Sequence, residues 1–325
     1  MTETITTLAV IGLAFSLDLL IGEPRNQWHP VAWFGRFVAF LDRDWASTDR
    51  GQQVVGIAIA GFTPLLPAIV AGGLVYAVGT IQPLAGAVLA GVVLFVSTSL
   101  RSLLELTETV LEATEGDLEI AREEIRGLVG RERTGLSSEQ LRSAAIESVA
   151  ENLADGLVAS LVAFALFAPV SLPVATAAAV WVKGVNTLDS MLGYPEKPIG
   201  TASARLDDFV MWIPARLTAL AIAAAAGNLR ALWEARTWAR VPASPNSGWP
   251  MATLACVLSI RLWKVGVYDL NPDADLPTIE DGTRAVTLVG FAAVVSVIFA
   301  VVLATASGAL VEITSANEAV EVIRP

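Results

Sequence analysis

Nine side chains that can bind phosphate, metal or an amine flank a long uncharged segment in the middle of this chain. They are Glu147, Glu151, Asp155, Lys183, Asn186, Asp189, Arg205, Asp207 and Asp208. The uncharged segment covers residues 156–182, a run of 27 residues. An ionised group near hydrocarbon costs about 3 kcal/mol, so charges placed there usually face a cavity, a partner or a polar ligand. The clustering predicts a polar site built against membrane-embedded helices.

Three of the carboxylates are spaced for one helix face. Glu147, Glu151 and Asp155 are four residues apart, so a helix places them on the same side. Like charges on one face repel each other by about 0.3 kcal/mol per pair unless a cation lies between them. Mg2+ with phosphate co-ligands suits such a site, because this ion prefers oxygen ligands and keeps several waters. The alternative is a solvated acidic face without a ligand.

A second cluster follows the uncharged segment. Arg205, Asp208, Trp212 and Arg216 also share a helix face at spacings of three and four, and Asp207 adjoins them. The alternative for Arg205 and Asp208 is a surface ion pair that contributes little to stability.

A third cluster, Lys183, Asn186 and Asp189, combines a cation, an amide and a carboxylate within seven residues. Together the three clusters provide carboxylates for a metal and cations for a phosphoryl group in transfer, as nucleotide-dependent acyl activation requires. The chain has neither a Gly-x-x-x-x-Gly-Lys-Ser/Thr loop nor a Gly-x-Gly-x-x-Gly run, so any ATP site is an unusual one.

The composition excludes several other kinds of site. His29 is the only histidine and Cys256 the only cysteine, which rules out a histidine pair, an internal disulfide and a multi-cysteine metal site within one chain. The net charge of -11 with no basic stripe argues against a nucleic-acid partner. His29 stands between Trp28 and Trp33, so an interfacial histidine without chemistry is the alternative interpretation of this residue.

The elements that position these residues are predicted to be membrane helices. The mean hydropathy is +0.61, and residues 51–100 contain no Asp, Glu, Lys, Arg or His. We expect an all-α, polytopic helical bundle with about four to six membrane segments and amphipathic cytoplasmic helices. Gln82-Pro83 marks a turn within the uncharged run. The predicted spans are residues 4–21, 54–80, 83–100 and 285–311.

The uncharged segment 156–182 needs a separate interpretation. Nearly all Lys and Arg residues fall between the predicted spans, so these loops are expected on the cytoplasmic side of the cell membrane. The chain must then enter and leave the segment on the same side, and Pro169 to Pro173 provides a break in its middle. A re-entrant or interfacial hairpin backed by protein satisfies both conditions, and a single kinked span is the alternative.

Other parts of the chain are assigned from local signals. Residues 101–155 are predicted to form a polar helical insert, split near Gly116 and Asp117, with a second helix capped at Ser137 or Ser138. We expect Gly22 to Arg50 to be a polar loop and Ala204 to Gly227 to be one helix.

Five motifs occur in order along the chain: DLLIGEPRNQWHPVAWFGR (18–36), AAIESVAENLADG (144–156), KGVNTLDSMLGY (183–194), ASARLDDFVMWIPARLTAL (202–220) and SPNSGWP (244–250). In this order they resemble the CobD/CbiB family, which comprises the adenosylcobinamide-phosphate synthases of cobalamin biosynthesis. The resemblance runs from Asp18 to about Tyr268, roughly three quarters of the chain.

The resemblance implies an ATP-dependent amide ligation. It joins a propionate side chain of adenosylcobyric acid to (R)-1-aminopropan-2-ol or to its O-phosphate, with Mg2+ and ATP as the expected cofactor and co-substrate. It also implies an integral protein of the cytoplasmic membrane, where other late corrinoid-assembly enzymes are expected partners. Whether the amine is phosphorylated, and whether ATP yields ADP or AMP, is left open.

On this hypothesis the candidate residues take four roles. The metal ligands are Glu147, Glu151, Asp155, Asp207 and Asp208. The groups that stabilise phosphate charge are Lys183, Arg205 and Arg216. The groups that position the amine or nucleotide are Asn152, Asn186 and Asp189. The groups that meet the aminopropanol phosphate or the corrin are His29, Arg36 and Trp249.

Two other function classes fit parts of the same sequence. A membrane transporter of a polar or anionic solute would use intramembrane charges to line a path, although the chain shows no inverted repeat. A membrane transferase acting on Mg-bound diphosphates would also use acidic clusters, and it would be indifferent to ATP hydrolysis.

Overall fold

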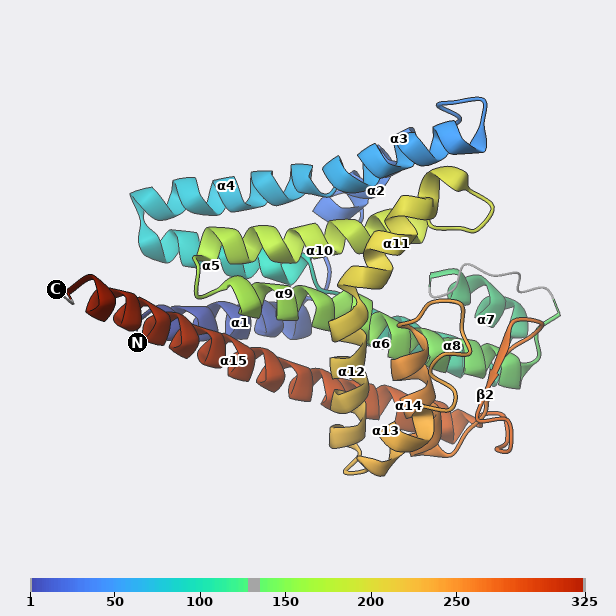
Figure 1. The fold of residues 1–325 in the computed structure, drawn as a ribbon. Coiled ribbons are helices and arrows are strands. Elements are labelled where there is room, and N and C mark those ends of the chain that lie inside the picture. The colour runs from blue at the N-terminus through green and yellow to red at the C-terminus, as the bar shows by residue number, and fades with distance from the viewer. Residues whose placement is uncertain (1, 128–134, 324–325) are drawn as a thin grey trace. The chain divides into compact units, whose positions relative to one another are not determined.

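The computed structural model describes residues 2–127 and 135–323, so the part of the predicted insert at 128–134 lies outside the described residues. The described chain is mostly helical with two short strands, which confirms the predicted all-α class (Figure 1). It divides into two compact units. Unit 1 comprises Met1–Thr98, Ser160–Leu206 and Val297–Pro325, and unit 2 comprises Ser99–Ala159 and Asp207–Ser296.

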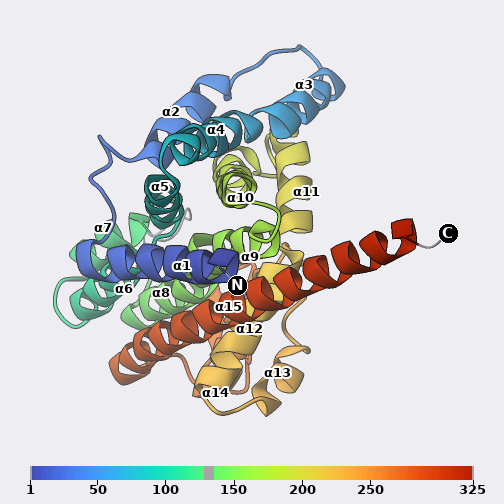
Figure 2. The same ribbon diagram turned by 90° about the vertical axis from the view of Figure 1, so that its left-hand side faces the viewer.

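Unit 1 is a bundle in which α10 is the central helix. Its elements are α1 (Thr2–Ile21), α2 (Pro30–Leu41), α3 (Asp49–Phe62), α4 (Leu65–Ile81), α5 (Pro83–Val96), most of α9 (Ala159–Phe167), α10 (Leu172–Leu192), a 3-10 turn (Pro198–Gly200), most of α11 (Thr201–Val210) and the later part of α15 (Ile279–Ile323). Helix α10 packs against α2, α4 and α5, and α1 packs against α5 (Figure 2). The two helices α9 and α10 bound the predicted hairpin.

Unit 2 combines helices with one small hairpin. Its elements are α6 (Leu100–Ala113), α7 (Leu118–Glu124), a 3-10 turn (Ile125–Gly127), α8 (Ser138–Leu153), a π-helical turn (Ala154–Val158), α12 (Trp212–Ala225), α13 (Arg230–Ala235), α14 (Gly248–Leu258), β1 (Leu262–Lys264), β2 (Tyr268–Leu270) and the start of α15. Helix α14 packs against α8, α12 and α13, and β1 packs against α8. These contacts bring three sequence-distant segments to one region of unit 2.

Within the part of the chain that the structure describes, five helical segments are long and apolar enough to cross a membrane, which indicates a multi-pass membrane protein. They are Thr4–Ile21, Asp49–Ile81, Pro83–Ala113, Ser138–Phe167 and Ile279–Ala309. The turn at Gln82 lies where the sequence placed it, and Gln82 caps α5 by accepting the N–H of Leu84. The first residue of a helix has no carbonyl within the helix to accept its N–H. Pro83, which has no N–H, is therefore well suited to begin α5, and the chain turns there.

The predicted break in residues 156–182 falls between α9 and α10. Helix α9 ends at Phe167, and Ser171 caps α10 by accepting the N–H of Val174. The helices on both sides of this break extend beyond the uncharged segment. The helical segment before the break, Ser138–Phe167, is 30 residues long, and α10 after it is 21 residues long. The re-entrant hairpin and the kinked span both stay predictions with respect to the membrane.

Two local assignments from sequence were wrong, and one element was missed. The polar loop between the first two spans contains α2, because His29 caps a 12-residue apolar helix that starts with Pro30. The helix predicted over 204–227 is two helices bent by 48° at Met211. Pro214 explains the bend, since its ring clashes with the carbonyl four residues earlier. The β-hairpin at residues 262–270 was not predicted.

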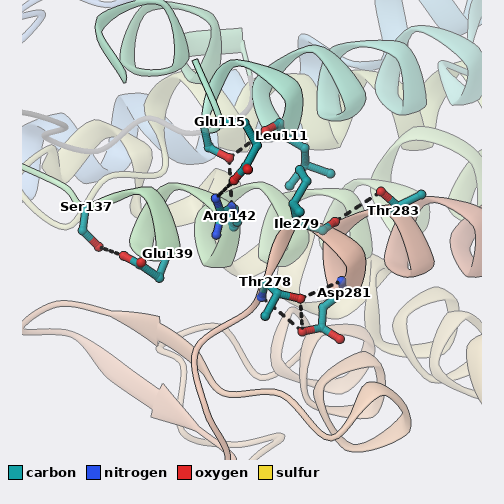
Figure 3. Close-up of polar contacts among 10 residues, drawn as sticks. Leu111, Glu115, Ser137, Glu139, Arg142, Thr278, Ile279, Asp281 and Thr283 are labelled. Atoms are coloured by element: carbon teal, nitrogen blue, oxygen red, sulfur yellow. Dashed lines mark hydrogen bonds and ion pairs between the residues drawn. The ribbon is translucent and has the colours of Figure 1, made fainter. Parts of the chain in front are cut away.

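Capping and one buried arginine hold the insert together. Of the two predicted caps, Ser137 is the one that begins α8, and it forms a capping box with Gln140. Buried Arg142 donates from Nε to Thr114 Oγ1 at 2.9 Å and pairs with Glu115, tying α8 to the break after α6 (Figure 3). That break, before α7, is the split predicted near Gly116.

Candidate functional site

The first part of the site is the buried carboxylate of Glu147 on α8. Ser143 Oγ donates to Glu147 Oε1 and Tyr268 Oη donates to Glu147 Oε2, both at 2.7 Å. Ser143 Oγ in turn accepts the backbone N–H of Trp263 at 2.7 Å. The Glu147 side chain therefore fixes the β-hairpin against α8. With 3% exposure, it is also shielded from solvent.

The next turns of the same helical segment carry the other predicted acidic residues. Glu151 and Asn152 are half-buried on α8, and Asn152 Nδ2 donates to Ser148 O at 3.0 Å and to Ser148 Oγ at 2.9 Å. Asp155 lies in the π-helical turn, which packs against α12. A π-turn inserts an extra residue into the helical repeat, so Asp155 departs from the strict four-residue register of the other two carboxylates.

The carboxylates do not form a metal cage of their own. Among the side chains that the structure describes, at residues 4–126 and 135–309, no three from His, Cys, Asp or Glu gather as metal ligands. Mg2+ that arrives with ATP needs only one or two protein carboxylates, because phosphates and water fill the other positions.

The second part of the site is a loop clamp, which we define as Asp208, Arg216, Ser244 and Asn246. Buried Asn246 donates from Nδ2 to the Asp208 carbonyl at 2.8 Å and accepts from Arg216 Nη1 at 2.6 Å. Ser244 Oγ accepts the N–H of Asn246 at 3.2 Å and donates to Asp208 Oδ1 at 3.4 Å. The 244–250 segment thus holds the end of α11 and the start of α12 in fixed positions.

Two indole rings complete the surroundings of Arg216. Its guanidinium carbon lies 4.6 Å from the ring centroid of Trp212 and 5.3 Å from that of Trp249. Arg216 Nη1 also donates to the Trp212 carbonyl at 2.8 Å. The cation is therefore stacked and hydrogen-bonded, and its position is well defined for an anionic ligand. Of the predicted residues, unit 2 brings Asp208, Arg216 and Trp249 together.

The other predicted residues, apart from Asp207, lie in unit 1. Lys183, Asn186 and Asp189 are on α10, with Asn186 buried and the other two half-buried. Arg36 on α2 and Arg205 on α11 are exposed. Asp207, like Asp208, is half-buried at the end of α11 and belongs to unit 2.

His29 is buried in the protein, which differs from the interfacial alternative. It is 6% exposed, whereas the neighbouring Trp28 and Trp33 are 68% and 48% exposed. Its Nδ1 accepts the N–H of Val31 at 3.2 Å as the cap of α2. Burial, and next the positive charge of Lys183, lower the pKa of His29 below its ordinary value of 6.5.

This pKa predicts how stability depends on pH. The unfolded chain protonates His29 near pH 6.5, and the folded protein resists protonation, so the unfolded state binds more protons between the two pKa values. The free energy of unfolding should therefore be at its maximum with respect to this group above pH 6.5 and should decrease as the pH drops below 6.5. The unfolding temperature in detergent, measured between about pH 5 and pH 8, tests this dependence. The same slope in His29→Asn, which keeps the cap, would contradict it.

Gly248, in the segment that carries Ser244 and Asn246 of the loop clamp, permits a close approach to the backbone of Ala239. A Cβ atom at this position would lie 2.3 Å from the carbonyl oxygen of Ala239, which is backbone and cannot rotate away. We expect Gly248→Ala to destabilise the protein by about 1–3 kcal/mol. Gly73→Ala is the matched control, because nothing lies within 4 Å of its added methyl. Equal unfolding temperatures for the two variants would show that the approach is not required.

Two cavities lie apart from these residues. One of about 630 Å³ in unit 2 is lined by parts of α12, α14 and α15, including Arg284 and Phe291. One of about 560 Å³ in unit 1 lies among α1, α4, α5 and the turn before α10. Neither lining contains a predicted site residue, so the candidate site is not one of these two cavities.

Four residues of the site were not assigned a role from sequence: Ser143, Ser244, Asn246 and Tyr268. Ser244 and Asn246 stand in the motif SPNSGWP, so the motif itself was the available signal. Tyr268 is 121 positions from Glu147, and nothing local indicates their hydrogen bond.

Comparison with known proteins identifies the family. The family model described as CobD/Cbib protein matches residues 11–298. The probable cobalamin biosynthesis protein CobD of Methanothrix thermoacetophila is 33% identical over 93% of this chain and 98% of its own length. The cobalamin biosynthesis protein CobD of Geobacter metallireducens is 37% identical over 84% of this chain and 86% of its own. No solved structure matches significantly. The chain therefore belongs to the CobD/CbiB family.

Proposed function

We propose that this protein acts in cobalamin biosynthesis as an ATP-dependent amide ligase. It joins adenosylcobyric acid to (R)-1-aminopropan-2-ol or its O-phosphate and forms adenosylcobinamide or its phosphate. Family membership and the names of the relatives support a role in cobalamin biosynthesis. The specific reaction goes beyond those names and is the one that the motif resemblance implies, and the chemistry of the residues supports it.

The observation that carries the proposal is the loop clamp. Asn246 connects the backbone of Asp208 to the guanidinium of Arg216, with distances of 2.8 and 2.6 Å. Stabilising a transferring phosphoryl group requires a cation that is already in position before the reaction, because reorientation would cost free energy. Arg216, held by hydrogen bonds and two indole rings, meets this requirement.

The proposed reaction has two steps. A carboxylate oxygen of the corrin side chain attacks the γ-phosphorus of ATP, the bond to the bridging oxygen breaks, and ADP leaves. The amine nitrogen attacks the acyl carbon, phosphate leaves with the electrons of the C–O bond, and the nitrogen loses a proton. Arg216 stabilises charge on the phosphoryl oxygens, and Glu151 and Asp155 bind MgATP, whose metal offsets phosphate charge.

The other predicted roles are kept as parts of this proposal. Glu147 remains a proposed metal ligand, and it also positions the β-hairpin through Ser143 and Tyr268. Asp207 and Asp208 remain proposed metal ligands, and the predicted roles of Lys183, Asn186, Asp189, Arg205 and Arg36 stay predictions. We also propose the cytoplasmic membrane as the location, with the polar loops on the cytoplasmic side and contacts to other late corrinoid enzymes.

Direct reconstitution tests the proposed reaction. The protein in detergent is incubated with adenosylcobyric acid, MgATP and either aminopropanol or its phosphate, and corrinoids and nucleotides are followed by mass spectrometry. We expect a corrinoid mass gain equal to the amine minus water, dependent on both ATP and Mg2+, with release of ADP. The amine that reacts identifies the substrate.

The competing classes predict different results in the same assay. Folded protein that forms no amide with either amine would contradict the ligase. Uptake of corrinoid into proteoliposomes without amide formation would favour transport, and product formation without ATP hydrolysis would favour a diphosphate transferase.

A further inference from the structure

The single histidine has an unusual local environment for a buried side chain. His29 is 6% exposed and lies immediately before α2, in a segment outside the candidate membrane spans. Its Nδ1 accepts the N–H of Val31. Its Nε2 is shielded from solvent and has no hydrogen-bond partner among the residues whose side chains the structure describes, 4–126 and 135–309. Buried polar atoms are nearly always paired, so this atom calls for an explanation.

The cap determines which nitrogen carries the proton. A neutral imidazole has one N–H donor and one acceptor nitrogen. Because Nδ1 accepts the N–H of Val31, the proton must be on Nε2. The atom without a partner is therefore a donor, and it needs an acceptor oxygen.

A positive charge acts on the same imidazole. Helix α10, which carries Lys183, packs against α2 in unit 1 (Figure 1), and the charge of Lys183 lowers the pKa of His29. A buried N–H donor that experiences the charge of an ammonium group is in a poor environment for a second cation and a good one for an anion. An oxygen that carries negative charge can accept from Nε2 and interact with Lys183 at the same time.

We propose that His29 Nε2 and Lys183 bind an anionic oxygen group, a phosphate or a carboxylate, of a substrate. The inference deepens the proposed function, on which it rests only for the origin of the anion. A phosphate would come from ATP or the phosphorylated amine, and a carboxylate from the corrin. His29 is a binding residue on this proposal, and its cap fixes the tautomer that makes binding possible.

One histidine in the chain makes the test direct. Protein labelled with 15N-histidine gives one imidazole, whose two nitrogens are resolved by long-range proton–nitrogen correlation. At pH 8, where the neutral form dominates, we expect a proton on Nε2 and none on Nδ1. Inorganic phosphate and acetate are then titrated separately, and the Nε2 resonance is followed. A proton on Nδ1, or no saturable shift with either anion, would overturn the proposal.

Variants separate binding from folding. Lys183→Met should raise the dissociation constant of the effective anion at least about tenfold, the size expected for a lost charge-assisted contact. Lys264→Met is the matched control, because this lysine lies in unit 2 and should leave the titration unchanged. An equal dissociation constant in Lys183→Met and the wild-type protein would remove Lys183 from the site.

The kinetic readout distinguishes this inference from the proposed function. His29→Asn keeps a good helix cap and removes the Nε2 donor. In an active ligase it should raise the KM of one anionic substrate with little change in kcat, which a purely structural role would not do. An unaltered KM for ATP, corrinoid and phosphorylated amine would contradict the site. If the wild-type protein shows no ligase activity, the NMR titration still decides whether the anion site exists.

Discussion

Glu151→Gln is expected to lower kcat/KM for amide formation by at least about 100-fold, the effect typical of losing one preorganised electrostatic group. Glu151 is half-buried on α8, one turn from buried Glu147. Glutamine has the same shape and helix propensity but cannot bind MgATP as a carboxylate does. The unfolding temperature should change little. The measurement is the corrinoid mass assay together with a thermal melt in detergent.

Glu139→Gln is the matched control for this variant. Glu139 is exposed in the first turn of the same helix, and its carboxylate accepts from Ser137 Oγ at 2.7 Å, a bond that glutamine retains. It should keep full activity. Wild-type activity in Glu151→Gln would remove Glu151 from the proposed mechanism, and a large fall in both variants would indicate a general effect of charge on α8.

Arg216→Lys is expected to reduce kcat/KM about 10- to 100-fold although the positive charge is kept. Lysine cannot donate to Asn246 Oδ1, the Trp212 carbonyl and the Pro245 carbonyl in the geometry of the guanidinium. It also loses the planar stack on Trp212 and Trp249. Kinetics with varied ATP measure the effect, which should appear mainly in kcat if the cation acts in the transition state.

A double-mutant cycle with Asn246→Ala tests whether the loop clamp acts as a unit. Asn246→Ala alone removes a buried amide that bonds both Asp208 and Arg216, and it should destabilise the protein by about 1–3 kcal/mol. Because the two residues share a hydrogen bond, the double variant should lose less activity than the product of the single effects. Strictly additive effects would show that Arg216 does not depend on Asn246.

Local chemistry made the helices and their ends predictable. Long uncharged runs indicated the apolar helices, and Gln82-Pro83 and Ser137 marked a turn and a cap that the structure contains. These features depend on neighbours within about four residues, so sequence alone carries the information. The bend at Met211 also had a local signal, Pro214, that the helix assignment did not use.

The β-hairpin had no such signal. Its strands are three residues each, too short for a period-two pattern to be recognised. It is held by long-range contacts, Tyr268 Oη to Glu147 and the Trp263 N–H to Ser143, and by the Arg261–Asp269 ion pair at its base. Burial of partners more than 100 residues apart cannot be inferred from local pattern.

The sequence by itself determined the helical membrane class, the family and which residue types are available for chemistry, because composition, periodicity and motif order are properties of the chain. Only the tertiary structure decided that Asn246 connects Asp208 to Arg216, that Glu147 anchors a hairpin, and that His29 is buried with its Nε2 donor near the charge of Lys183. The physical reason is that hydrogen-bond partners and burial depend on which segments pack together. Helical spacing determines only which residues share a face of one helix.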